Sequence, residues 1–258
     1  MTRTVLITGS SRGVGAAAAK LFSSHGYNIT INCSRSIESA ESVAADCRKL
    51  GASAVTVIQA DVSKESDCDE LVSKTVNSFG NLDVLVNNAA TTKFAFDHGE
   101  MDALTPADFQ YIYATNVVGP YNLIKFAKPH LLKSSCPSVV NVASIAGISG
   151  IGSSVAYAAS KGALITMTKS LSRVLGPIKM NAVCPGFIQG EWLKQGLGSE
   201  HYESIKTKIE NSNPLGKTCT PEDVAHAIYF FAAEQNIVTG ETLVLDGGSH
   251  LHMTPLKR

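Results

Sequence analysis

The sequence has no excess of charge of either sign and no long apolar run, and these absences exclude broad classes of protein. Its 22 Lys and Arg residues balance 22 Asp and Glu residues, so the formal net charge is zero. Nucleic acids and anionic membrane surfaces attract basic domains, and we expect neither as a partner. No stretch approaches the roughly 18 uninterrupted apolar residues of a membrane span. The apolar run within the opening "MTRTVLITG" is too short for a signal peptide.

The sequence also lacks paired cysteines. Its six cysteines are scattered and include no CxxC pair. In a chain of 258 residues this indicates reduced, structural thiols rather than a disulfide framework or a zinc site. We therefore expect an intracellular, cytoplasmic protein with no bound metal. Repeats, low-complexity tracts and linkers are absent too, which favours one domain over residues 1–258.

What the sequence does contain is a regular alternation of strand-like and helix-like segments. The strands are apolar runs rather than clean alternations, which is typical of a parallel sheet covered on both faces. The prediction is an α/β fold, a single doubly wound Rossmann-type domain with about seven parallel strands and helices on both faces. The expected strands are 5–8, 28–33, 54–59, 82–86, 138–142, 179–183 and 242–245, and the expected helices are 13–25, 37–50, 64–79, 106–133, 155–175 and 221–234.

A glycine-rich segment, "TGSSRGVG" at residues 8–15, lies between the first strand and the first helix. Glycines here allow a tight turn and a close approach of the backbone to a ligand, and a helix amino terminus offers unpaired N–H groups to phosphate. The pattern alone also fits a simple tight turn, but the first crossover of a parallel sheet is where dinucleotides bind. We predict a dinucleotide site that includes Gly9, Ser11, Arg12, Gly13, Val14 and Gly15.

The end of the second strand indicates which dinucleotide is bound. A free ribose 2′-hydroxyl is usually held there by Asp or Glu, whereas a 2′-phosphate requires arginine. No acidic residue lies between Lys20 and Glu38, Arg35 follows the strand, and Arg12 lies in the glycine loop. Two guanidinium groups on one phosphate favour NADP(H) over NAD(H), although each arginine could also be a solvated surface residue.

The pentapeptide "YAASK" at residues 157–161 places a tyrosine and a lysine on one helical face, because they are four residues apart. A free phenol has a pKa near 10. A neighbouring ammonium favours the phenolate and lowers the pKa of Tyr157 toward the working pH. Ser144 follows the fifth strand, where it could polarise a carbonyl. The alternative is a serine cap and a helix whose Tyr157 and Lys161 form only a polar edge.

Taken in order, these motifs resemble the classical short-chain dehydrogenase/reductase family. The resemblance covers nearly the whole chain, and its overall pattern is most similar to 3-oxoacyl-[acyl-carrier-protein] reductases. The matching pieces are "TGSSRGVG", "DV" at 61–62, "NNAA" at 87–90, "TN" at 115–116, Ser144, "YAASK", "PG" at 185–186 and the ending "GETLVLDGG".

The resemblance implies a role for each matching residue. Tyr157 is implied to donate a proton to the substrate carbonyl, and Ser144 to hydrogen-bond the substrate oxygen. Lys161 is implied to hold the cofactor ribose and to lower the pKa of Tyr157. Asn116 is implied to anchor a water in a proton relay. Asparagine is a mediocre helix former, so its place in the middle of a predicted helix suits a local distortion of that helix.

Further cofactor contacts follow from the same resemblance. For Asp61 the alternative is a loop residue before the next helix, and for Asn88 and Ala89 it is a structural turn. The residues implied to contact the cofactor, besides the glycine loop and Arg35, are Asp61, Val62, Asn88, Ala89, Tyr157, Lys161, Pro185, Gly186 and Ile188.

Three departures from the family pattern bear on cofactor and substrate. Ala90 replaces a glycine beside the cofactor, and Gly190 stands where a threonine often binds the nicotinamide amide. The short turn at 175–179 lacks an arginine that commonly docks carrier-bound substrates. Residues 189–214 are expected to form a mobile lid that excludes water and shapes the pocket. Trp192, the only tryptophan, is either a packing anchor or a substrate contact.

The expected function is the NADPH-dependent reduction of a ketone or 3-oxoacyl carbonyl to a secondary alcohol. A second hypothesis is the oxidation of a secondary alcohol, sugar or steroid, and a third is a dinucleotide-binding scaffold or redox sensor without catalysis. The substrate is a small-molecule carbonyl that the sequence does not specify. The resemblance implies a homotetramer, or a homodimer, built from the long helices and the last strand.

Overall fold

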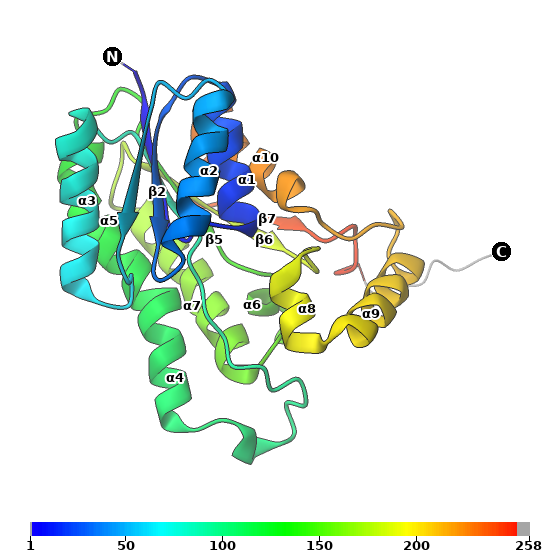
Figure 1. Ribbon diagram of the computed structural model, residues 1–258. Coiled ribbons are helices and arrows are strands. Elements are labelled where there is room, and N and C mark those ends of the chain that lie inside the picture. The colour runs from blue at the N-terminus through cyan, green and yellow to red at the C-terminus, as the bar shows by residue number, and fades with distance from the viewer. Residues whose placement is uncertain (1, 252–258) are drawn as a thin grey trace.

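Short apolar strands form the centre of the protein (Figure 1). The computed structural model describes residues 2–251, so residue 1 and residues 252–258 of the predicted domain lie outside the described residues. Within that range seven strands pair in parallel in the order β3-β2-β1-β4-β5-β6-β7, which confirms the doubly wound prediction. They are β1 (Thr4–Ile7), β2 (Asn28–Cys33), β3 (Ala54–Gln59), β4 (Val84–Asn87), β5 (Ser138–Val142), β6 (Lys179–Pro185) and β7 (Thr242–Leu245).

Helices cover both faces of this sheet. Side chains alternate across a strand, so Val5 and Ile7 of β1 pack with Phe22 on one face, while Leu6 packs with Leu71 on the other. Helices α1, α2 and α10 cover the first face, and α3, α5 and α7 cover the second (Figure 1). The helices are α1 (Gly13–Ser24), α2 (Ile37–Lys49), α3 (Glu65–Phe79), α4 (Pro106–Tyr113), α5 (Gly119–Leu131), α6 (Ala146–Ser149), α7 (Val155–Ser172), α8 (Glu191–Leu197), α9 (Ser199–Ser212) and α10 (Pro221–Tyr229).

The predicted continuous helix over 106–133 is interrupted. A π-helical turn, η2 (Ala114–Val118), separates α4 from α5, and the N–H of Gly119 bonds the carbonyl of Ala114, five residues back. Pro120 has no N–H, so the carbonyl of Asn116 loses its usual donor four residues along the helix. Asn116 lies within this π-turn, so the local distortion expected there is confirmed. Single π-turns inside α-helices are frequent at functional sites.

Helices α6, α8 and α9 were not predicted as separate elements. Helix α6 has only four residues, and α8 and α9 lie in the segment expected to form a lid. Among residues 2–251, no helix is both long and apolar enough to cross a bilayer.

Candidate active site

The candidate residues gather at one edge of the sheet because parallel strands end on the same side. β1 and β4 are neighbours and lead into Gly9 and Asn88. β5 and β6 are neighbours and lead into Ser144 and Gly186. The structure therefore brings together segments separated by most of the length of the chain.

The glycine loop requires glycine at specific positions. Gly9 and Gly13 have φ of +60° and +55°, in the left-handed region that residues with a side chain rarely adopt. Gly15 has no such φ, but a Cβ there would lie 2.6 Å from Nδ2 of Asn88 and 2.7 Å from the carbonyl oxygen of Gly9. Helix α1 begins at Gly13. Its first N–H groups therefore open onto this loop, which fits a dinucleotide pyrophosphate.

Two polar residues that the sequence analysis missed hold this loop in place. The Oδ1 of Asn32 accepts a hydrogen bond from the N–H of Gly9 at 3.1 Å, and its Nδ2 donates to the carbonyl of Ala60 at 3.1 Å. The hydroxyl of Thr8 accepts from the N–H groups of Asn88 and Ala89, both at 3.0 Å. The only sequence signal for Asn32 was a polar residue within an apolar strand.

Asn88 also has a structural role. Its Nδ2 donates to the carbonyl of Thr8 at 2.8 Å and to that of Gly9 at 3.1 Å. These bonds tie the end of β4 to the glycine loop. They fit the structural alternative for Asn88 and keep the loop in the shape that a cofactor would meet.

Arg12 and Arg35 are exposed at the ends of neighbouring elements. Arg12 is the residue before α1, and Arg35 follows β2, the strand beside β1. Both side chains are exposed, and within residues 2–251 neither forms an ion pair with a carboxylate. Both guanidinium groups are thus available to a phosphate, which fits a 2′-phosphorylated dinucleotide.

Asp61 and Val62 form a turn before α3. The Oδ1 of Asp61 accepts from the N–H and the hydroxyl of Ser63, at 3.1 and 2.8 Å. The N–H of Asp61 donates to Asp67 at 2.9 Å, and the side chain of Val62 is buried. These contacts match the alternative reading of Asp61 as a loop residue that precedes a helix.

Ser144, Tyr157 and Lys161 meet beside β5. The hydroxyl of Ser144 accepts from the N–H of Ala146 at 3.1 Å, and this side chain lies close enough to Tyr157 to favour its phenolate. Lys161 is buried, its Nζ lies 5.6 Å from the centroid of the Tyr157 ring, and it donates to the carbonyl of Val142 at 2.8 Å. The two residues share a helical face as predicted.

Burial shifts the pKa values of this pair in opposite directions. It raises the pKa of Tyr157 to about 12, because the phenolate is poorly solvated, and Ser144 only partly opposes this rise. It lowers the pKa of Lys161 to about 8, because the ammonium is poorly solvated. The predicted lowering of the Tyr157 pKa by Lys161 stays a prediction: Lys161 is not among the groups that shift this pKa here, and its Nζ donates to the carbonyl of Val142.

Asn116 is buried within η2 and is held by the loop that follows β4. Its Oδ1 accepts from the N–H of Thr91 at 2.8 Å, and its Nδ2 donates to the carbonyl of Thr91 at 2.9 Å. The same Nδ2 donates to the hydroxyl of Ser160 at 3.0 Å. Ser160 precedes Lys161 in α7, so Asn116 joins η2 to the helix that carries the tyrosine and the lysine.

The last residue of β6 is Pro185, and Gly186 and Ile188 follow it in the loop beyond the strand. The N–H of Gly186 donates to the carbonyl of Leu245 at 2.7 Å, and a Cβ at Gly186 would lie 2.8 Å from the Cβ of Asp246. Gly186 is therefore fixed by close packing against the end of β7. Ile188 is partly buried against the core.

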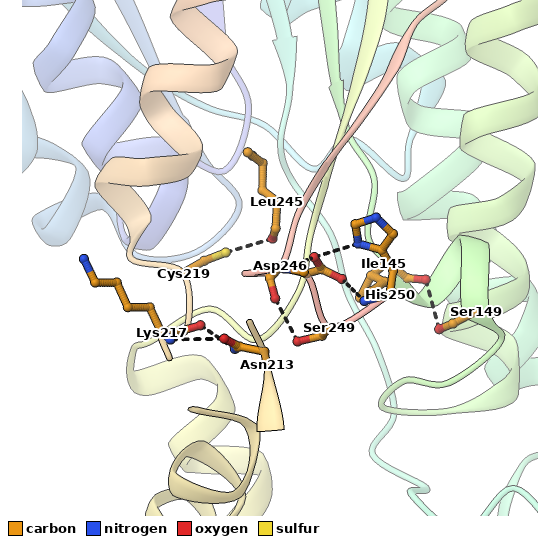
Figure 2. A network of polar contacts seen from close by, with 10 residues as sticks. Ile145, Ser149, Asn213, Lys217, Cys219, Leu245, Asp246, Ser249 and His250 are labelled. Atoms are coloured by element: carbon orange, nitrogen blue, oxygen red, sulfur yellow. Dashed lines mark hydrogen bonds and ion pairs between the residues drawn. The ribbon is translucent and has the colours of Figure 1, made fainter. Parts of the chain in front are cut away.

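Backbone hydrogen bonds hold the segment 189–214 near both of its ends. The N–H of Gln189 donates to the carbonyl of Cys219 at 2.8 Å, and the N–H of Leu215 donates to that of Gly247 at 3.1 Å. Gly247 belongs to a turn closed by the buried Asp246, whose carboxylate accepts from the backbone and Nδ1 of His250 at 2.8 and 2.9 Å (Figure 2). The turn after β7 thus supports the end of the segment.

Trp192 of α8 lies over the tyrosine. Its ring centroid is 6.2 Å from that of Tyr157 and 5.6 Å from that of Phe94. Phe94 was not singled out from the sequence, where the loop after β4 was expected only to shape the pocket. Trp192 is therefore packed against the site itself.

Comparison with known proteins agrees with this geometry. Residues 9–250 match the family model described as enoyl-(acyl carrier protein) reductase. A protein assigned as ketoacyl reductase 2 of the granaticin polyketide synthase of Streptomyces violaceoruber is 39% identical over 247 residues, covering 95% of each chain. A solved structure assigned as a short-chain dehydrogenase/reductase of Burkholderia xenovorans has a TM-score of 0.89 and 34% identity, covering 97% of this chain and 98% of that one. The chain belongs to the short-chain dehydrogenase/reductase family.

A second solved structure in this comparison contains a dinucleotide. It is that of ElxO with NADP bound, with a TM-score of 0.86 and 33% identity, covering 98% of this chain and all of that one, 100%. The predicted family resemblance and its ketoreductase pattern are confirmed.

Two of the three departures from the family pattern, Ala90 and Gly190, have structural explanations. Ala90 is exposed, and no residue other than glycine has a positive φ within residues 2–251, so the alanine does not strain its turn. Gly190 has φ of +148°, a conformation that a threonine would adopt only with strain. Its N–H donates to the hydroxyl of Tyr202 at 3.2 Å. In this family member the position thus connects α9 to the start of α8.

Proposed function

We propose that the chain reduces a ketone or 3-oxoacyl carbonyl to a secondary alcohol, with NADPH as the hydride donor. The observation that carries this proposal is the meeting of Ser144, Tyr157 and Lys161 at the edge of the sheet where the glycine loop also lies. The similarity to a ketoacyl reductase and to an NADP-bound structure supports it.

The cofactor would lie along the carboxyl edge of the sheet. The amino terminus of α1 would hold the pyrophosphate, and Arg12 and Arg35 would hold the 2′-phosphate. When bound, NADPH supplies a hydride to the carbonyl carbon. The proposed cofactor contacts are Gly9, Ser11, Arg12, Gly13, Val14, Gly15, Arg35, Asp61, Val62, Asn88, Ala89, Tyr157, Lys161, Pro185, Gly186 and Ile188.

Tyr157 would act as the proton donor. Because burial raises its pKa, the phenol is protonated at neutral pH, and it would donate its proton as negative charge develops on the substrate oxygen. Ser144, beside this phenol, would also donate to the substrate oxygen.

Lys161 and Asn116 would support the proton transfer. With a pKa of about 8, Lys161 is mostly charged at pH 7 and would bind the ribose hydroxyls and favour the phenolate formed after transfer. The carbonyl of Asn116, freed by Pro120, would bind a water that returns a proton toward Lys161.

The family model is described for enoyl reduction, whereas the proposed substrate is a ketone. Reduction of a ketone places negative charge on its oxygen and needs an acid there. The protonated Tyr157 and the hydroxyl of Ser144 provide two such donors. We therefore favour the carbonyl, and an enoyl thioester serves as the comparison substrate.

The test is the Tyr157→Phe variant, assayed by NADPH oxidation with a panel of ketones, 3-oxoacyl thioesters and an enoyl thioester. The variant should bind NADPH like the wild type and lose ketone reduction by roughly 10²–10⁴-fold, because it lacks the acid. Tyr121→Phe, at an exposed tyrosine of α5, is the matched control. Full activity of Tyr157→Phe would refute the mechanism.

Two other results would favour the alternative functions. Turnover only in the oxidative direction, with a secondary alcohol, sugar or steroid, would support a dehydrogenase. Tight NADPH binding with no turnover on any substrate would support a scaffold or redox sensor.

We also propose the wider setting of the enzyme. The whole chain, 1–258, would be one domain in which residues 189–214 form a lid over the substrate.

Large side chains are exposed along the stretch from α4 to α5, namely Tyr111 (53%), Val118 (47%) and Tyr121 (50%), and β7 is the edge of the sheet. These surfaces support a homotetramer or homodimer. The six cysteines are free, which supports a reducing, cytoplasmic location.

A further inference from the structure

Four aromatic rings gather over the proposed reaction centre. We call Phe94, Phe96, Tyr157 and Trp192 the aromatic cluster. The centroids of Phe94 and Phe96 are 5.5 Å apart, those of Phe94 and Trp192 are 5.6 Å apart, and those of Trp192 and Tyr157 are 6.2 Å apart. All three distances lie in the range at which aromatic rings attract one another. The proton donor is thus the inner end of a continuous aromatic surface.

The loop that carries Phe94 and Phe96 is fixed to the helix that carries Tyr157. The N–H of Ala95 donates to the carbonyl of Ser153 at 2.8 Å, and the hydroxyls of Thr92 and Ser153 are 2.8 Å apart. Ser153 lies just before α7. One wall of the aromatic cluster is therefore built on the same rigid element as the proton donor.

The opposite wall is α8. Phe94 packs against Gly196 so closely that a Cβ at this glycine would lie 2.2 Å from the Cζ of Phe94. Trp192, one turn earlier in α8, reaches the same ring. The two walls therefore meet through aromatic side chains.

The loop that carries Phe94 and Phe96 is acidic beyond Phe96. Asp97, Glu100 and Asp102 are exposed within the six residues that follow Phe96. Two lysines of the walls are paired with carboxylates: Lys93 with Asp108 at 2.8 Å, and Lys194 of α8 with Glu191 at 3.8 Å. Exposed carboxylates repel a phosphate. A substrate attached through phosphopantetheine, which carries a phosphate, is therefore disfavoured relative to an uncharged one.

From these observations we infer that the substrate is an uncharged aromatic ketone, bound as a free molecule with its ring against Trp192 and Phe94. This inference rests on the proposed function, because the ring must bring its carbonyl to Tyr157. A flat ring next to Trp192 gains stacking in addition to burial, whereas a linear acyl chain gains only burial. The aromatic cluster thus selects the shape of the substrate, and the acidic loop after Phe96 selects its charge.

The test compares three probes in the wild type and in variants of the aromatic cluster. The probes are 2-tetralone (aromatic, uncharged), the N-acetylcysteamine thioester of acetoacetate (linear, uncharged) and acetoacetyl-CoA (linear, anionic). The wild type should have its highest kcat/KM with 2-tetralone and its lowest with acetoacetyl-CoA. Trp192→Leu should lower kcat/KM for 2-tetralone about tenfold and that for the uncharged thioester less than about twofold. NADPH affinity should not change.

Further variants distinguish a specific loss of the aromatic contact from misfolding. Trp192→Phe keeps an aromatic ring and should keep most of the activity on 2-tetralone, while Phe94→Leu should resemble Trp192→Leu. The combination of Asp97→Asn and Glu100→Gln should raise kcat/KM for acetoacetyl-CoA alone.

Several results would overturn the inference. Equal losses on both uncharged probes in Trp192→Leu would mean that the tryptophan only packs the lid. A wild type that prefers either linear thioester would refute the aromatic substrate and leave the proposed ketone reduction intact. A wild type that binds NADPH and reduces none of the probes would refute the proposed function itself.

Discussion

Replacing Lys161 with methionine is expected to remove a pH-dependent part of the folding stability. Lys161 is only 2% exposed, and its pKa in the folded protein is about 8, against 10.5 for an ordinary lysine. Burial of the ammonium causes this difference, because the charged form loses its hydration.

The sign follows from proton binding. Between pH 8 and 10.5 the unfolded chain holds the proton on Lys161 while the folded protein has released it. The free energy of unfolding therefore rises with pH across this window, and below about pH 8 the full cost of burying the charge is present. At about 1.4 kcal/mol for each pKa unit, the rise amounts to on the order of 3 kcal/mol.

The assay is urea unfolding of the wild type and of Lys161→Met at several pH values from 7 to 10.5. Both chains should carry Cys184→Ser, because the pKa of this buried thiol is raised to about 11 and its charge interacts with Lys161. The free energy of unfolding of the parent minus that of the methionine variant should increase by about 3 kcal/mol over the window. A difference that stays flat or falls would refute the burial argument.

Three further variants test separate parts of the structure. Gly15→Ala should lower the free energy of unfolding by about 1–3 kcal/mol, because its Cβ would lie 2.6 Å from Nδ2 of Asn88; unchanged thermal melts would contradict this. Arg35→Ser should raise KM for NADPH at least about tenfold and leave KM for NADH unchanged, since a charge-assisted phosphate contact is lost; equal effects on both cofactors would argue against a 2′-phosphate site. Thr105→Ala removes the capping box of α4 and should cost about 1 kcal/mol in urea unfolding with kcat unchanged; no loss of stability would mean that the cap is redundant.

Much of the fold could be predicted because buried parallel strands need apolar, β-branched runs. The bounds of β2, β3, β5 and β7 were predicted to the residue. The single helix predicted over 106–133 is interrupted by the π-turn at Ala114–Val118. Helical propensity does not predict this turn, because its cause is the N–H that Pro120 lacks and that the carbonyl of Asn116 would otherwise accept from.

Only part of the candidate site could be predicted from the sequence. Tyr157 and Lys161 could be paired from their spacing, because a helix sets that distance locally. The hydrogen bonds of Asn32 could not be predicted, since its partners Gly9 and Ala60 follow two different strands, β1 and β3, that are far apart in the chain. Helices α8 and α9 were also missed; they bury almost none of their side chains, so burial leaves little mark on their sequences.

The sequence by itself determined the order of strands and helices, the glycine loop and the spacing of tyrosine and lysine, since all of these depend on residues close together in the chain. Only the tertiary structure decided the protonation of Tyr157 and the identity of the rings around it. Burial by distant segments sets the phenol's pKa, and contact between α8 and the loop after β4 brings Trp192 to Phe94. Both depend on which distant residues meet in three dimensions, and local patterns do not encode that.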